Sequence, residues 1–242
     1  MTAPISLTDL SPFMRYKIDP WLLVKEGRVW TLREDSDDDD VRILMPPKPH
    51  IFHHIRLWMC GDAFDRSTRT WKSGKAPHPW AQQALEQNPD FDPRFQSHKK
   101  SRRMMMTWLM SFLHVWYAAS NPGRTVGVGA KKAANSDYLL RKRYRFIFDN
   151  LDPECFDGRK PEVHQKENYM EFSNGSHIMG FAADEDGWRQ FTFTKVHLEE
   201  VAFWDAYGDT YAGLRPATSQ ATIVSTPLDG TDYKHQFQNE VI

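Results

Sequence analysis

A polar segment, a cationic turn and the start of an apolar run follow one another in Phe95-Gln96-Ser97-His98-Lys99-Lys100-Ser101-Arg102-Arg103-Met104-Met105-Met106-Thr107-Trp108. The apolar run continues to Ser120 with large side chains at helical spacing, which predicts a buried helix that begins near Met104. A helix start directs unpaired backbone N–H groups and a partial positive charge at the preceding turn. The turn is therefore a candidate anion site.

The same segment follows the strand, phosphate loop and helix plan of a nucleotide triphosphatase. Against the pattern G-x-x-x-x-G-K-[ST], Thr107 supplies the hydroxyl, but Lys100 replaces the first glycine and Met105-Met106 replace Gly-Lys. Lys100 can supply the point charge, Arg102 and Arg103 can bind phosphate oxygens, and Thr107 can ligate Mg²⁺. The alternative is a basic turn before a buried helix, because loops of this kind often need glycine at positive φ.

Composition limits the class of protein. With 242 residues, of which 40% are hydrophobic, the chain can bury a core as one large or two small domains. The formal net charge of −1 means that any contact with nucleic acid must come from a local basic patch. Two distant cysteines predict a reducing compartment. No apolar run reaches the roughly 20 residues of a membrane span, and no signal-peptide pattern begins the chain, so we expect a cytosolic location.

Further strands are predicted downstream. A short buried strand is expected within 124–130, and Asn174-Gly175 predicts a tight β-hairpin. The strand that starts at Lys195 ends in two acids, of which Glu199 would hold Mg²⁺ through water and Glu200 would orient the attacking water. Strands that alternate with helices predict an α/β fold with a mainly parallel sheet and a ligand at the carboxyl ends of its strands.

Two other segments leave alternatives open. Gln82 and Gln83 lie just upstream of the cationic turn, where several ATPases place a glutamine that recognises the adenine edge, although a surface glutamine has the same spacing. The basic helix expected within 131–148 carries Arg141, Lys142, Arg143 and Arg145. Those charges could contact DNA or form an ordinary solvated face.

The order of these elements resembles the ATPase domain of the large terminase subunit, the DNA-packaging motor of tailed bacteriophages. The family loop S-R-Q-x-G-K-T aligns with Ser101–Thr107, and some members carry the lysine at the loop's start, where Lys100 stands. The family's hydrophobic-D-E-A-x-F-x-D segment is matched by Leu198–Asp205, with Glu199 in place of the usual aspartate. The family coupling motif S-T/A-P is matched by Ser225-Thr226-Pro227, and Asn174-Gly175-Ser176 is similar to its N-G-S turn.

The resemblance implies a P-loop NTPase fold of the ASCE type, a mainly parallel central sheet flanked by helices with an added β-hairpin. It implies ATP and Mg²⁺ as cofactors, Thr107 and Glu199 as metal ligands, and Ser225 and Thr226 as coupling residues. The implied catalytic residues are Glu200 and Arg189, the latter as an arginine finger given to a neighbouring subunit. The alternative for Arg189 is a surface ion pair with Asp184 or Asp186. The nucleotide-binding set is Lys100, Ser101, Arg102, Arg103, Met104, Met105, Met106, Thr107, Gln82 and Gln83.

The resemblance covers residues 77–241, so we expect a P-loop ATPase core at 77–242 and an N-terminal extension at 1–76. The family's C-terminal nuclease domain is not expected in a chain that ends at Ile242. The implied function is ATP-driven translocation of double-stranded DNA into a procapsid. Its implied partners are the portal protein, the small terminase subunit and further copies in a pentameric ring, in the host cytoplasm and transiently at the procapsid portal, with no membrane. The alternatives are a helicase-like ATPase and a non-hydrolysing module that binds DNA or the portal through a degenerate loop.

Overall fold

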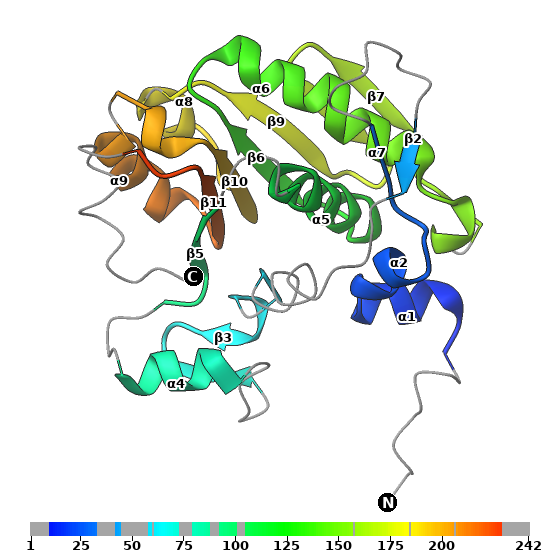
Figure 1. Ribbon diagram of the computed structural model, residues 1–242, viewed down its shortest axis with the longest axis horizontal. Helices are drawn as coiled ribbons and strands as arrows, with labels where there is room; N and C mark the ends of the chain where they lie inside the picture. Colours follow the sequence, from blue (N-terminus) through cyan, green and yellow to red (C-terminus); the bar gives the residue numbers. More distant parts are fainter. Residues whose placement is uncertain are drawn as a thin grey trace, which may run out of the picture.

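The computed structural model describes residues 10–32, 42–44, 58–59, 61–72, 79–87, 92–100, 105–156, 158–183, 185–205 and 207–228. Its centre is a seven-stranded sheet with the order β5-β11-β10-β6-β9-β8-β7 (Figure 1). The strands are β5 (Phe95–Lys99), β6 (Thr125–Gly129), β7 (Val163–Lys166), β8 (Tyr169–Phe172), β9 (His177–Phe181), β10 (Lys195–Glu199) and β11 (Ala221–Ser225). The first five strands in this order pair in parallel, which confirms the predicted α/β fold with a mainly parallel sheet.

The predicted β-hairpin is confirmed. Strands β8 and β9 pair antiparallel, and β7 pairs antiparallel with β8 at the edge of the sheet. Gly175 adopts φ 80° in the connecting turn, a conformation that glycine takes without steric cost. The Asn174 side chain donates to the carbonyl oxygens of Ala118 and Ala119, each at 2.9 Å. The turn therefore satisfies carbonyl groups in the last turn of the central helix.

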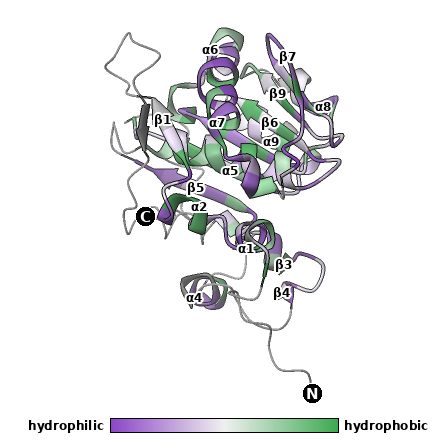
Figure 2. Cartoon of the chain, turned by 90° about the vertical axis from the view of Figure 1, so that its right-hand side faces the viewer, coloured by the Kyte–Doolittle hydropathy of each residue, from purple (hydrophilic) through white to green (hydrophobic). Residues whose placement is uncertain are grey.

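That central helix is α5 (Met106–Ser120), which is apolar on nearly every side because the sheet and the outer helices enclose it. On the same face of the sheet lie α6 (Ala133–Leu139), the π-helical turn η3 (Leu140–Tyr144) and α7 (Arg145–Asn150). In Figure 2 the outer strand β7 is largely hydrophilic, whereas the interior strand β6 is not. The π turn η3 interrupts the segment within 131–148 that was predicted as one basic helix.

The opposite face of the sheet is covered by α8 (Glu185–Arg189) and α9 (Tyr207–Ala217), with the 3-10 turn η5 (Val201–Phe203) between β10 and α9. Side chains of a strand alternate between the two faces. On β10, Val196 and Leu198 therefore pack beneath α8 and α9. His197 instead faces α5, where its ring stacks on that of His114.

The N-terminal part contributes several short elements. They are α1 (Pro12–Ile18), α2 (Trp21–Lys25), β1 (Trp30–Leu32), β2 (Arg42–Leu44), β3 (Phe64–Asp65), β4 (Thr70–Trp71) and α4 (Pro79–Gln87), with the 3-10 turn η4 (Pro153–Phe156) beside α1. Tyr16 and Leu23 belong to the main core, whereas Phe64 and Trp71 pack with Leu85 in a small separate cluster. The boundary at residues 76 and 77 stays a prediction.

Residues of this N-terminal part also close the amino end of the sheet. Lys195, at the start of β10, is buried and donates to Asp62 Oδ1 at 2.8 Å, with its ammonium 4.1 Å from the centroid of a Trp58 ring. Gln220 donates to the carbonyl oxygen of Trp58 at 2.6 Å.

Among the described residues, no helix is long and apolar enough to cross a membrane.

Candidate nucleotide site

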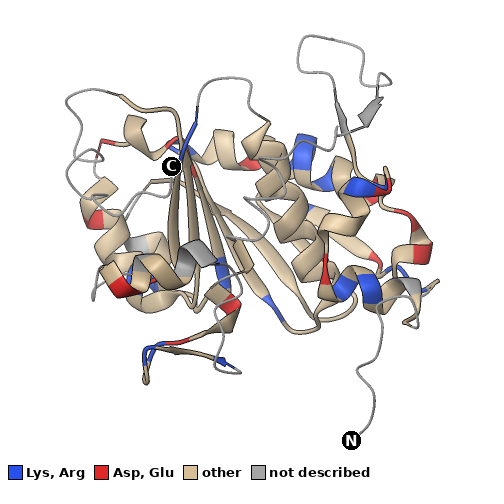
Figure 3. Cartoon of the chain, turned by 60° about the horizontal axis from the view of Figure 1, so that its bottom comes forward, with Lys and Arg blue, Asp and Glu red and all other residues tan. Residues whose placement is uncertain are grey.

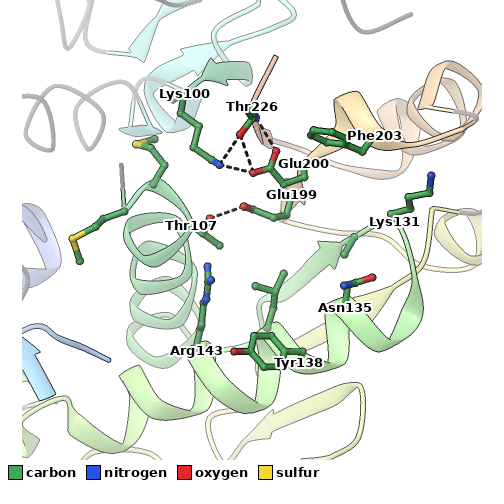
Figure 4. Close-up of a pocket in the computed structure, with 14 residues that line it drawn as sticks. Lys100, Thr107, Lys131, Asn135, Tyr138, Arg143, Glu199, Glu200, Phe203 and Thr226 are labelled. Carbon is green, nitrogen blue, oxygen red and sulfur yellow. Dashed lines mark hydrogen bonds and ion pairs between the residues drawn. The ribbon is translucent and has the colours of Figure 1, made fainter. Parts of the chain in front are cut away.

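A cavity of about 690 Å³ opens at the carboxyl ends of the parallel strands, beside the first turn of α5. This is where parallel α/β sheets bind ligands, and the volume is typical of a small-molecule site. Figure 4 shows Lys100, Glu200 and Thr226 at one end, Thr107 and Glu199 in the middle, and Tyr138 and Arg143 at the other. The lining residues are Lys100, Met105, Met106, Thr107, Ala130, Lys131, Asn135, Tyr138, Leu139, Arg143, Glu199, Glu200, Phe203 and Thr226.

Three strand ends meet through a Lys–Glu–Thr cluster. Lys100 follows β5, and its Nζ forms an ion pair with Glu200 Oε1 and lies 3.3 Å from Thr226 Oγ1. The Thr226 backbone N–H donates to Glu200 Oε2 at 2.8 Å. The lysine side chain is 9% exposed and that of Glu200 is 35% exposed. The cation and the carboxylate are therefore held together at the rim of the cavity.

The position of Glu200 depends on an unusual backbone conformation. Strand β10 ends at Glu199, and Glu200 adopts φ 54°, a left-handed conformation that is uncommon for residues other than glycine. This turn directs Glu200 toward Lys100, while Glu199 stays on the face of the sheet that meets α5. Ser225 accepts a hydrogen bond from the Ala202 N–H at 3.1 Å and so links the ends of β10 and β11. The sequence predicted different roles for the two acids, and in the structure the left-handed turn at Glu200 is what directs their side chains apart.

Glu199 is buried and hydrogen-bonded through both carboxylate oxygens. Thr107 Oγ1 donates to Oε1 at 2.5 Å, and His197 Nε2 lies 2.9 Å from Oε2. Burial by itself would raise the pKa of Glu199, but the hydrogen bonds from His197 and Thr107 and the charge of Lys100 hold it below its usual value. Glu199 is thus an ionised carboxylate directed at a threonine hydroxyl.

The first turn of α5 carries the cost of the missing glycines. The helix begins at Met106 rather than near Met104, because Met105 adopts φ 58°. Met105 is the residue that aligns with the glycine of S-R-Q-x-G-K-T, so the strain falls where that pattern has a residue without a side chain. Ser101, Arg102, Arg103 and Met104, predicted to bind phosphate, lie outside the described residues.

The residues that could hold a divalent cation are Thr107 and Glu199. Their oxygens converge at the edge of the cavity, and Mg²⁺ prefers oxygen ligands. The described residues contain no group of three or more His, Cys, Asp or Glu side chains that could hold a metal ion by themselves. Mg²⁺ is commonly bound by one or two protein oxygens together with substrate phosphates. The donor set therefore fits a cation that arrives with a nucleotide.

Other predicted site residues lie away from the cavity. Gln82 accepts a hydrogen bond from Trp71 Nε1 at 2.9 Å and donates to Glu86 at 2.6 Å, and Gln83 is exposed. Arg189 is exposed on α8 and is absent from the cavity lining. The structure does not bring these three side chains to Lys100 within one chain.

Sequence reasoning did not place several residues at the cavity that line or support it, and it assigned Arg143 to a basic helix that could contact DNA or form a solvated face. Tyr138 of α6 is 54% exposed at its rim, and Arg143 of η3 has its guanidinium carbon 5.4 Å from the centroid of a Trp108 ring. His197 could have been found, since it lies two residues before Glu199 on a strand and must share its face. Tyr144, whose hydroxyl contacts His197, could not have been found, because no local pattern predicts the π turn in which it lies.

No protein-family model matches the chain. Among solved structures, its fold is similar to that of large terminase ATPase domains. The Thermus phage P74-26 ATPase domain shares 17% identity at a TM-score of 0.45, over 60% of this chain and 63% of that one. The HK97 bacteriophage large terminase shares 11% identity at a TM-score of 0.45, over 71% of this chain and 37% of that one. The large terminase of a thermophilic bacteriophage, in complex with ATP-gamma-S, shares 15% identity at a TM-score of 0.40, over 62% of this chain and 38% of that one. The chain thus spans less than two thirds of each.

Proposed function

We propose that this chain is an ATP-hydrolysing motor domain of the large-terminase type, which couples ATP hydrolysis to translocation of double-stranded DNA into a procapsid. The observation that carries the ATPase part is the convergence of Lys100, Thr107, Glu199 and Glu200 at one edge of a parallel sheet. A cation, a hydroxyl and two carboxylates at this edge are the groups that phosphoryl transfer requires. The terminase part rests on the order of motifs along the sequence.

The phosphates would bind between Lys100 and the first turn of α5. The helix is 15 residues long, and its first N–H groups attract anions without any side chain. Lys100 would supply the cation that Met106 cannot. Thr107 and Glu199 would hold Mg²⁺, which neutralises charge on the phosphate oxygens when it is bound.

Glu200 would orient the attacking water, and its ion pair with Lys100 defines a resting state. A γ-phosphate that approaches Lys100 competes with Glu200 for the ammonium group. When Lys100 no longer pairs with it, the Glu200 carboxylate keeps its hydrogen bond from the Thr226 backbone N–H. It can then accept a proton from water. Thr226 directly follows β11. The exchange would therefore also shift the segment that contains the proposed coupling residues, Ser225 and Thr226.

Arg189 would complete a neighbouring site in an assembled ring. It is exposed on α8, so it can reach a second chain, and a cation that arrives only on assembly makes hydrolysis depend on the ring. From the motif resemblance we propose a homo-oligomeric ring, a pentamer, that acts on double-stranded DNA with the portal protein and the small terminase subunit. The proposed location is the host cytoplasm, at the procapsid portal.

A second candidate is a non-hydrolysing module that binds DNA or the portal. Two observations favour it: the loop lacks Gly-Lys, and the ion pair keeps Lys100 occupied by Glu200. A helicase-like ATPase would share the site but separate the strands of a duplex.

Phosphate release from ATP tests the choice among these functions. The motor proposal predicts Mg²⁺-dependent release that stops when the metal is chelated, with no separation of DNA strands. The binding module predicts no release at any protein concentration, although DNA or the portal still binds. Release accompanied by duplex unwinding would favour the helicase-like function.

A further inference from the structure

A buried histidine and tyrosine lie directly behind the Glu199 carboxylate. His197 Nε2 is 2.9 Å from Glu199 Oε2, and His197 Nδ1 is 2.8 Å from the hydroxyl oxygen of Tyr144. Neither the His197 nor the Tyr144 side chain is accessible to solvent. The chain of contacts therefore runs from the π turn η3, through β10, to the carboxylate at the edge of the cavity.

The direction of these hydrogen bonds follows from the groups involved. An ionised carboxylate only accepts hydrogen bonds, so the Nε2 atom of His197 must carry a proton. When the ring is neutral, the Nδ1 atom is then the acceptor for the Tyr144 hydroxyl. Each end of the imidazole is thus engaged, which fixes both its tautomer and its orientation.

Two further features keep the imidazole in place. The His114 ring of α5 stacks on it with centroids 5.4 Å apart and planes inclined by 2°, while His114 Nδ1 lies 2.7 Å from the Met110 carbonyl oxygen. Tyr144 ends a π-helical turn, a rare conformation that is frequent at functional sites. Within this turn Tyr144 is buried and contacts His197 of β10, whereas its neighbour Arg143 lines the cavity.

We propose that His197 and Tyr144 are positioning residues that orient Glu199 for binding Mg²⁺ together with Thr107, an inference that rests on the proposed function. His197 engages Oε2 and Thr107 engages Oε1, so the carboxylate cannot rotate. A ligand held in one orientation binds a cation without first losing rotational freedom. Groups that orient metal ligands in this way commonly change metal affinity by about 10-fold to 100-fold when they are altered.

The matched comparison uses a second Tyr–His pair in the same chain. Tyr169 and His177 pair through the hydroxyl and Nδ1 at 2.5 Å, on the β8–β9 hairpin and away from the cavity lining. Tyr144→Phe and Tyr169→Phe each remove one hydroxyl and keep the ring. If Tyr144 were merely structural, the two variants would differ in thermal stability alone.

The experiment measures binding of ATP-gamma-S to the full chain as the Mg²⁺ concentration is varied. Tyr144→Phe and His197→Leu are expected to raise the Mg²⁺ concentration for half-maximal binding by about 10-fold to 100-fold. His197→Gln, which keeps a donor, should recover part of the loss, and Tyr169→Phe should match the wild type. In nitrogen NMR of the chain without nucleotide or metal, the His197 resonances, assigned by their loss in His197→Gln, should report the tautomer protonated at Nε2.

Three results would overturn the inference. One is a folded Tyr144→Phe variant with the Mg²⁺ dependence of the wild type, and this variant decides the matter if His197→Leu does not fold. Another is His197 protonated at Nδ1 alone in the NMR spectrum. The third is a wild type that binds ATP-gamma-S without any dependence on Mg²⁺, or not at all. This result would overturn the proposed function as well, and the Tyr169→Phe control would then show the same defect as the wild type.

Discussion

Replacing Lys100 by alanine distinguishes the two interpretations of the loop, a phosphate-binding loop and a cationic turn before a buried helix. If Lys100 takes the place of the lysine that the loop lacks at Met106, its ammonium contributes charge-assisted hydrogen bonds to phosphate. Each is worth about 1.5–3 kcal/mol, so the loss of one lowers ATP affinity by about 10-fold to 150-fold. The stability cost is expected to be smaller, below about 2 kcal/mol, because the partner Glu200 is 35% exposed and keeps its bond from the Thr226 N–H.

Met106→Ala is the matched control, since Met106 also lines the cavity but carries no charge. Met106 is only 3% exposed, so truncation should lower the free energy of unfolding by about 2–5 kcal/mol. Its ATP affinity should stay within a few-fold of the wild type at a temperature where it is folded.

The assay combines equilibrium binding of ATP, phosphate release and urea unfolding on both variants. The expected pattern is a loss of binding and turnover in Lys100→Ala and a loss of stability in Met106→Ala. Equal loss of turnover in both variants, with folding intact, would refute the assignment of Lys100.

Three further outcomes follow from the site and the surface. Met105→Gly should be more stable to urea than Met105→Ala by about 1 kcal/mol, because both remove the side chain but only glycine relieves the left-handed backbone; equal or reversed stabilities would contradict the strain. DNA binding, for which the basic residues at 141–145 are candidates, should weaken by roughly 0.9 log units per decade of salt for each phosphate neutralised, and insensitivity to salt would exclude backbone recognition. If Arg189 acts in the neighbouring site, mixed Arg189→Ala and Glu200→Gln chains should regain part of an effect worth about 10³ to 10⁵ in rate, and no rescue in mixtures that co-assemble would favour a surface arginine.

The basic residues at 141–145 already have acidic neighbours, so DNA binding has to be measured over a range of salt concentrations. Arg141 pairs with Asp137 and Arg145 with Asp149, each four residues apart, and the two arginine side chains are 58% and 37% exposed. Figure 3 shows basic and acidic residues interspersed along the helices. Exposed pairs of this kind are worth less than about 1 kcal/mol, so DNA phosphates can compete for the cations at low salt.

Local sequence patterns predicted those parts of the fold that local forces determine. The Asn174-Gly175 turn needs only the backbone freedom of glycine, and the apolar run after Met105 needs only its spacing to indicate a buried helix. The two acids were recognisable because they end a buried strand. In each of these cases the deciding residues are neighbours along the chain.

The remaining features depend on partners far away in sequence. The ion pair of Lys100 joins residues that are 100 positions apart, and Tyr144 reaches His197 across 53 positions. Gln82 was interpreted by its place before the loop, yet Trp71 of β4 engages it. Such contacts arise from the topology of the sheet, which no local spacing encodes.

The most direct test of the central claim is phosphate release by Glu200→Gln beside the wild type, with ATP binding measured on both. If Glu200 orients the attacking water, the variant should bind ATP with near-normal affinity and lose hydrolysis, because the amide cannot accept the proton. The neutral side chain also releases Lys100 from its ion pair, so binding should not weaken. Turnover by Glu200→Gln at a rate near that of the wild type would contradict the account.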